Sequence, residues 1–179
     1  MTQEDDRKSV AADRDHVQVR RARLGDEPDI AALDAAAWSP ESGFPSVIQA
    51  ADGSFFSPDS PPEAHLVAEI GGRITGYLRL KPMTRLPENA HVLGVFGLAV
   101  APAARRRGVA AALLAAAEGQ ARARGAAKLS LRVLSTNHSA IRLYERQGFA
   151  HEGLLRGEFL IDGRYVDDVL MAKQIRPTG

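Results

Sequence analysis

LAVAPAARRRGVA, residues 98–110, carries an apolar, strand-like run through a proline into a basic turn and on into the start of a long helix. The first N–H groups of a helix have no partner inside it, and the helix dipole places partial positive charge at the same end. Such an end binds phosphate groups. Gly108 and the small Ala110 would let a ligand approach the backbone closely. The stretch therefore predicts an anion-binding turn between a buried strand and a helix.

The three arginines of this turn, residues 105–107, have a second interpretation, which is a solvated turn in a chain rich in alanine and arginine. The residue content alone does not decide between the two. Nucleic-acid binding is disfavoured because the basic cluster is short and the net charge of +1 provides no extended basic surface. The sequence also lacks a Walker motif and a G-x-G-x-x-G turn after a strand, which excludes two common nucleotide-binding loops.

The composition is that of an ordinary globular protein, with 179 residues of which 45% are apolar and 25% are charged. That length fits one domain with a sizeable core. The absence of cysteine excludes disulfides, thiolate metal sites and a cysteine nucleophile, and the five histidines lack metal-ligand spacing, so we expect no metal. The charged start of the chain and the broken apolar run at residues 92–114 predict neither a signal peptide nor a membrane span. A cytoplasmic protein is the expectation.

Outward from the decisive turn, hydrophobic periodicity predicts a mixed α/β domain over residues 16–176, preceded by a disordered tail at residues 1–15. Gly71-Gly72 and Asp162-Gly163 are two-residue hairpin signals. A long loop, residues 39–62, is rich in Ser, Gly and Pro and has room for a short helix at residues 45–50. The expected strands are residues 17–22, 65–70, 73–80, 91–100, 128–134, 149–161 and 164–172, and the expected helices are residues 25–38, 107–124 and 137–147.

A second constellation, NHSAIRLYERQGF at residues 137–149, lies one strand beyond the long helix. Ala140 and Tyr144 are four residues apart and share a helix face, and Asn137 lies on the same side one turn earlier. A polar asparagine at the helix start and a phenol on that face could meet one ligand. The alternative for Tyr144 is a core aromatic residue packed beside Phe149.

The two stretches together read V-x-P-x-x-R-x-x-G-x-A followed by N-x-x-A-x-x-L-Y-E-x-x-G-F, in that order and separated by a helix and a strand. This combination resembles the GCN5-related N-acetyltransferase (GNAT) superfamily, and the element order follows that family from about residue 17 to residue 172. The resemblance implies an acyl-CoA N-acyltransferase fold, in which a mixed sheet has splayed central strands and ends in a C-terminal β-hairpin.

The resemblance also implies roles for individual residues. In the family, the strand before the turn pairs with the pantetheine arm of acetyl-CoA, the turn cradles the pyrophosphate, and a tyrosine protonates the departing thiolate, here Tyr144. Gly97 would mark the bulge that splays the strand. The implied acetyl-CoA contacts are Leu98, Ala99, Val100, Arg105, Arg106, Arg107, Gly108, Val109, Ala110, Ala111 and Asn137.

The activity implied is an N-acetyltransferase that moves an acetyl group from acetyl-CoA to a primary amine by direct attack in a ternary complex. The E-G-x-x-R sequence at residues 152–156, before an Asp-Gly hairpin, resembles members that acetylate small amines, amino acids or protein N-termini. A small-molecule acceptor is the leading expectation. The alternatives are a protein N-terminal acetyltransferase and a non-catalytic CoA-binding sensor. Homodimers are common among such proteins, but no residue pattern here decides the oligomeric state.

One feature departs from the family pattern. Many relatives carry a glutamate on the fourth strand as general base, whereas residues 94–98 contain no carboxylate. The base must therefore come from elsewhere or be a water chain. The candidates are His91, Glu69, Glu152 and Glu158. The pair Asp167-Asp168 could bind a cationic substrate, with one of the two carboxylates facing solvent.

Overall fold

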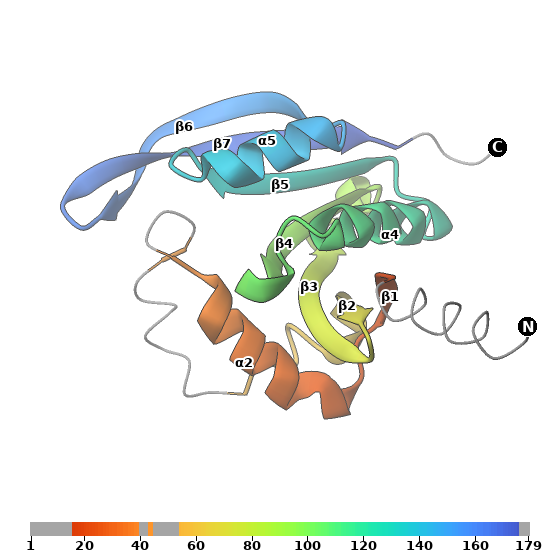
Figure 1. Ribbon diagram of the computed structural model, residues 1–179. Coiled ribbons are helices and arrows are strands. Elements are labelled where there is room, and N and C mark those ends of the chain that lie inside the picture. The colour runs from red at the N-terminus through yellow and green to blue at the C-terminus, as the bar shows by residue number, and fades with distance from the viewer. Residues whose placement is uncertain (1–15, 40–42, 45–53, 176–179) are drawn as a thin grey trace, which may run out of the picture.

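The computed structural model describes residues 16–39, 43–44 and 54–175, which form a seven-stranded sheet in the order β1-β2-β3-β4-β5-β7-β6 (Figure 1). The predicted tail and the predicted short helix at residues 45–50 lie outside the described residues. The strands are β1 Gln18–Arg21, β2 His65–Ile70, β3 Arg73–Pro82, β4 Val92–Val100, β5 Lys128–Leu134, β6 Ala150–Ile161 and β7 Arg164–Gln174. The helices are α2 Glu27–Ala37, α4 Val109–Ala123 and α5 His138–Arg146. The predicted mixed α/β fold is confirmed.

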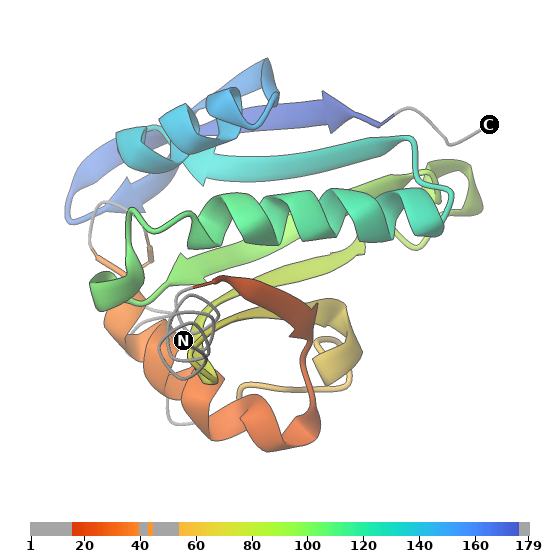
Figure 2. The same cartoon turned by 45° about the vertical axis from the view of Figure 1, so that its right-hand side comes forward.

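Helices cover both faces of the sheet. Successive side chains of a strand point to opposite faces, and here both faces carry apolar residues that the helices bury. Figure 2 shows α4 lying across β3 and β4, with α5 beside β5 and β7. Leu66 and Leu78 face α4 and share one core with its buried Leu113. The next residues along the same strands, Val67 and Tyr77, face the other way and pack with α2.

Both predicted hairpin turns are present. Gly71 and Gly72 have φ of 58° and 74°, and Asp162 and Gly163 have φ of 48° and 75°. Two consecutive positive φ values define the turn whose twist matches that of the flanking strands, which is why Gly-Gly and Asp-Gly favour it. The first turn joins β2 to β3 and the second joins β6 to β7.

The central strands β4 and β5 are paired over only part of their length. They run parallel and pair only from Val92 to Val95, opposite Lys128 to Leu131, although β4 continues to Val100 and β5 to Leu134. On its other edge β4 keeps pairing with β3 as far as Val100. The splayed strands that the family resemblance implies are therefore present.

The bulge in β4 lies at Phe96, one residue before the predicted Gly97. Arg79 pairs with Gly97 and Leu80 pairs with Val95, which leaves Phe96 as the extra residue. A Cβ atom at Gly97 would make only an ordinary contact of 3.6 Å with the Tyr77 ring. The Phe96 ring instead folds back over Gly94, where a Cβ atom would lie 2.5 Å from Phe96 Cε2. Gly94 thus leaves room for the Phe96 ring and for Met83 Sδ, which would lie 2.4 Å from an added Cβ atom.

Gly76 permits the close packing of β3 against α4. A Cβ atom there would lie 2.7 Å from Val109 Cγ1 and 3.0 Å from the Ala99 carbonyl oxygen. We expect Gly76→Ala to lower the free energy of unfolding by about 1–3 kcal/mol through overpacking, as measured by urea denaturation. Gly119 is the matched control, because it is an exposed helical glycine whose added Cβ would meet nothing within 4 Å. Gly119→Ala should raise the same free energy by about 1 kcal/mol, and an equal loss in both variants would contradict the packing argument.

Candidate functional site

A cavity of about 1330 Å³ opens where β4 and β5 separate. It is lined by the end of α2, the second half of β4, the turn and first residues of α4, the end of β5 and the inner face of α5. The predicted residues that line it are Leu98, Ala99, Val100, Arg105, Arg106, Gly108, Val109, Ala110, Ala111, Asn137 and Tyr144. Arg107 is the one predicted residue outside the lining. The fold thus brings two distant motifs to a single cavity.

The turn before α4 leaves its helical N–H groups facing this cavity. The predicted helix start at residue 107 is two residues too early, because Arg106 and Gly108 have φ of 65° and 81° and the helix begins at Val109. The N-cap makes no side-chain hydrogen bond, and the first backbone bond into the helix runs from the Ala112 N–H to the Gly108 oxygen at 2.9 Å. A Cβ atom at Gly108 would meet nothing within 4 Å. The open space and unused N–H groups suit an anionic group.

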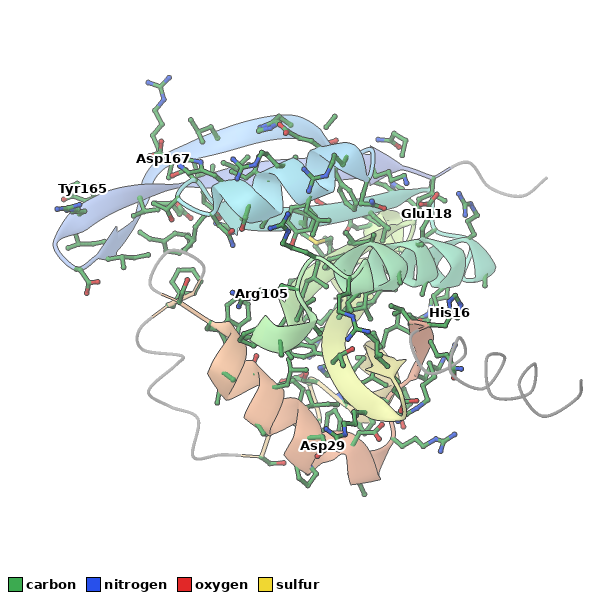
Figure 3. The ribbon with its side chains drawn as sticks, viewed as in Figure 1. His16, Asp29, Arg105, Glu118, Tyr165 and Asp167 are labelled. Atoms are coloured by element: carbon green, nitrogen blue, oxygen red, sulfur yellow. The ribbon has the colours of Figure 1, made fainter. Side chains whose placement is uncertain are left out.

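Arg105 has a structural contact that the sequence did not reveal. Its guanidinium donates a hydrogen bond of 2.8 Å to the Ala37 carbonyl oxygen at the end of α2. Figure 3 shows Arg105 beside that end of the helix. A cation near a helix C-terminus bonds to carbonyl oxygens that have no helical partner. Arg105 therefore links the turn before α4 to the end of α2, two segments that both line the cavity.

The α5 motif contributes a capped helix start and a buried phenol. The Asn137 Oδ1 atom accepts a hydrogen bond of 3.1 Å from the Ala140 N–H, as an N-cap does. Tyr144 lines the cavity, is only 8% exposed, and packs against Phe149 with ring centroids 5.8 Å apart. Burial raises the pKa of the Tyr144 phenol to about 12. The packing role and the cavity-facing role proposed from the sequence thus coexist, and the phenol keeps its proton at neutral pH.

The cavity has a second half, on the α2 side of the sheet, that sequence reasoning missed. The Asp34 carboxylate accepts hydrogen bonds from the Tyr77 hydroxyl and from Trp38 Nε1, the latter at 2.5 Å. Burial raises the pKa of Tyr77, and the Asp34 charge raises it further. The available signal was an aspartate four residues before a tryptophan on one helix face. Phe55 from the predicted long loop packs against the Tyr77 ring, with ring centroids 5.2 Å apart. Phe44 from the same loop also lines the cavity, but it packs against Phe159 of β6.

Asp168 lies at the β7 wall of the cavity and is only 2% exposed. Its carboxylate accepts a hydrogen bond from Arg132 Nε, and Arg132 also pairs with Glu158 at 3.1 Å. The neighbouring Asp167 does not simply face solvent as expected, because its carboxylate accepts a hydrogen bond of 2.7 Å from the Gly157 N–H. This bond holds the irregular pairing of β6 with β7 between Leu155 and Phe159.

The four sequence candidates for the general base all lie outside the cavity lining. Glu69 pairs with Arg20 at 2.5 Å, Glu152 pairs with Lys128 at 2.7 Å, and Glu158 pairs with Arg132. His91 is exposed at the start of β4.

Neither a metal site nor a membrane span is found in the part of the chain that the structure describes. Residues 16–39, 43–44 and 54–175 hold no group of three or more His, Cys, Asp or Glu side chains arranged to bind a metal ion. Among the helices formed by these same residues, none has the length and apolar character needed to cross a bilayer.

Comparison with known proteins agrees with this architecture. The family model described as Acetyltransferase (GNAT) family matches residues 29–149. The L-amino acid N-acetyltransferase AaaT of Escherichia coli (strain K12) is 34% identical over 119 residues, which cover 64% of this chain and 70% of that protein. These matches define an acyltransferase enzyme. The chain belongs to the GNAT acetyltransferase family.

Solved structures show the same fold. The Streptococcus mutans UA159 protein smu.2055 superimposes with a TM-score of 0.73 at 25% identity, over 89% of this chain and 99% of that chain. The putative acetyltransferase yncA from Salmonella typhimurium, whose structure includes its cofactor acetyl-CoA, has a TM-score of 0.72 at 21% identity, over 92% of this chain and 96% of that chain. At that identity the second likeness is one of fold alone.

Burial of Tyr144 predicts a pH dependence of stability. At pH about 11 the phenol is neutral in the folded chain, because its pKa is raised to about 12, but it is ionised in the unfolded chain, whose tyrosines titrate near pH 10. The unfolded state therefore binds fewer protons, and the free energy of unfolding falls as pH rises from about 10 to about 12. At pH about 11, ionisation of Tyr144 in the unfolded chain lowers the free energy of unfolding by about 1.4 kcal/mol.

Urea unfolding of the wild type and Tyr144→Phe at about pH 8 and about pH 11 measures this contribution. The alkaline loss of stability should be smaller in the variant by that amount. Identical losses in the two proteins would show that the phenol is not buried as described.

Proposed function

We propose that this enzyme transfers the acetyl group of acetyl-CoA to the amino group of a small, amino-acid-like acceptor. The observation that carries the proposal is a single cavity lined by the parted edge of β4, the N-terminus of α4 and the Tyr144 phenol. The similarity to an L-amino acid N-acetyltransferase supports the choice of a small acceptor over a protein N-terminus.

The residues of the cavity fit acetyl-CoA in three respects. Beyond Val95, the β4 edge that faces β5 offers main-chain groups to an amide-containing arm. The α4 N-terminus offers N–H groups and open space at Gly108 to a pyrophosphate, and Arg106 adds positive charge to the lining. Residues 98–100 would hold the pantetheine arm and residues 108–111 the pyrophosphate.

Acetyl-CoA, when bound, supplies a thioester whose carbonyl carbon an amine can attack directly. The chain then needs no nucleophile of its own, which accords with a sequence without cysteine. The main-chain N–H groups of β4 beyond the bulge would donate hydrogen bonds to the carbonyl oxygen as it gains charge. The Tyr144 phenol, which is neutral at physiological pH and whose pKa burial raises to about 12, would give its proton to the departing sulfur.

The protons balance if the acceptor loses two and the thiol gains one. An ammonium group first loses one proton, which we assign to water in the open cavity, because the four base candidates expected from the sequence lie outside its lining. The nitrogen loses its second proton, also to water in the cavity, once the new C–N bond has formed. The C–S bond breaks, the sulfur takes the proton of Tyr144, and solvent restores the phenol.

Gly108→Glu tests the phosphate-binding turn. A carboxylate there would occupy the open space and repel the pyrophosphate, so we expect acetyl-CoA affinity, measured by calorimetry, to fall by about a hundredfold or more. Gly108→Ala is the matched control, since it shares the strain at φ of 81° without the charge. If Gly108→Glu bound acetyl-CoA as well as Gly108→Ala does, the turn would not hold the pyrophosphate.

Tyr144→Phe tests the acid. Loss of the phenolic proton should lower kcat by about a hundredfold and leave the Kd for acetyl-CoA nearly unchanged, because the ring remains. The measurement is thiol release with an accepted amine at saturating acetyl-CoA. Tyr165→Phe is the control, since Tyr165 is 79% exposed at the tip of the β6–β7 hairpin (Figure 3). An unchanged kcat in Tyr144→Phe would reduce Tyr144 to a packing residue.

A further inference from the structure

Two half-buried side chains of opposite charge line the cavity without an ion pair. Asp34 accepts hydrogen bonds only from the neutral Tyr77 and Trp38 groups, and Arg79 donates only to neutral oxygens within residues 16–39, 43–44 and 54–175. The Arg79 bonds run to Ser60 Oγ at 3.2 Å and to the Phe96 carbonyl oxygen at 3.3 Å. Arg79 Nε is buried and has no hydrogen-bond partner in the part of the chain that the structure describes.

A second pair of opposite charges in this cavity, Asp168 and Arg132, does form an ion pair. Both residues line the cavity, and they neutralise each other through a direct hydrogen bond. Removing charges from water is unfavourable unless a counter-charge or polar partners replace the water. Asp34 and Arg79 have polar partners but no counter-ion among the residues that the structure describes. A ligand that carries both charges would therefore add the ion pairs that these residues do not supply to each other.

Asp34 and Arg79 both lie near the Tyr77 phenol, beside the segment of β4 that is no longer paired with β5. Arg79 is two residues after Tyr77 on β3, so both side chains project from the α2 face of the sheet. Asp34 accepts a hydrogen bond from the same phenol and comes from α2. Both charges also affect the pKa of Tyr77: burial raises this pKa most, the Asp34 charge raises it further, and the Arg79 charge lowers it. A Cβ atom at Gly97, the β4 residue opposite Arg79, would be 3.7 Å from the Tyr77 hydroxyl.

We propose that Asp34 and Arg79 together bind the head group of the acceptor, with Asp34 receiving its ammonium and Arg79 its carboxylate. The inference rests on the proposed function and specifies its substrate class as free α-amino acids. The guanidinium matches a carboxylate in charge and geometry, whereas amines and peptide N-termini that lack a neighbouring carboxylate leave Arg79 uncompensated. Tyr77 and Trp38 act as positioning residues, because they hold the Asp34 carboxylate in place.

The test compares kcat/KM for L-amino acids and for the corresponding amino acid amides, which keep the amine and lose the negative charge. Wild type should prefer the acid by about tenfold to a hundredfold. Arg79→Gln should bring the ratio close to one, and Arg79→Lys should restore part of the preference. Arg124→Gln, at an exposed position after α4, is the matched control and should keep the wild-type ratio.

Asp34→Asn separates the two charges. It should lower kcat/KM for the acid and the amide alike, by about tenfold or more, and leave their ratio unchanged. The Kd for acetyl-CoA, measured on every variant, should equal that of wild type. An unchanged Kd would show that the fold is intact, together with the donor half of the cavity, which is the half proposed to bind acetyl-CoA through residues 98–100 and 108–111.

Equal kcat/KM for acid and amide in wild type, or an unchanged preference in Arg79→Gln, would overturn the assignment. If no amine is acetylated although acetyl-CoA binds, the proposed function fails, and equilibrium binding of an L-amino acid and its amide then judges the head-group site. Tighter binding of the acid that is lost in Arg79→Gln would support it, and equal binding would overturn it.

Discussion

Backbone N–H and C=O groups on a strand require partners, and β4 stops pairing with β5 after Val95 although it continues to Val100. The bulge at Phe96 shifts the register of β4 against β3 at the same point. The rest of the site depends on this separation. It exposes a main-chain edge in the middle of a sheet, and it opens the cavity that α4 and α5 border on one side and α2 on the other. An extended molecule with amide groups can take the place of the missing strand.

The two halves of the cavity differ in how they present charge. The proposed donor half contains the α4 N-terminus and the turn that the Arg105 bond links to Ala37. The proposed acceptor half contains charged side chains and aromatic rings that surround Tyr77.

Local patterns predicted most of the elements. Gly-Gly and Asp-Gly require positive φ, and both hairpins formed where they stand. The position of the bulge could not be predicted, because it depends on the Phe96 ring packing over Gly94 and not on a glycine in the bulge itself. The start of α4 was misplaced by two residues for a similar reason, since Arg106 adopts positive φ, which the sequence did not indicate. The four candidate bases lie outside the cavity lining. Three of them, Glu69, Glu152 and Glu158, form ion pairs elsewhere, and His91 is exposed just before β4.

The sequence by itself determined the family and the residues expected at the donor half, because phosphate binding at a helix N-terminus uses contiguous backbone groups that a short motif encodes. The turn at residues 105–108 and the α5 motif belong to this class. Only the tertiary structure decided the acceptor half. Asp34 lies 43 residues before Tyr77 in the chain, and nothing local to either residue indicates their hydrogen bond. Whether a charged side chain finds a counter-ion depends on which strands and helices pack against each other, and this packing is a property of the whole sheet.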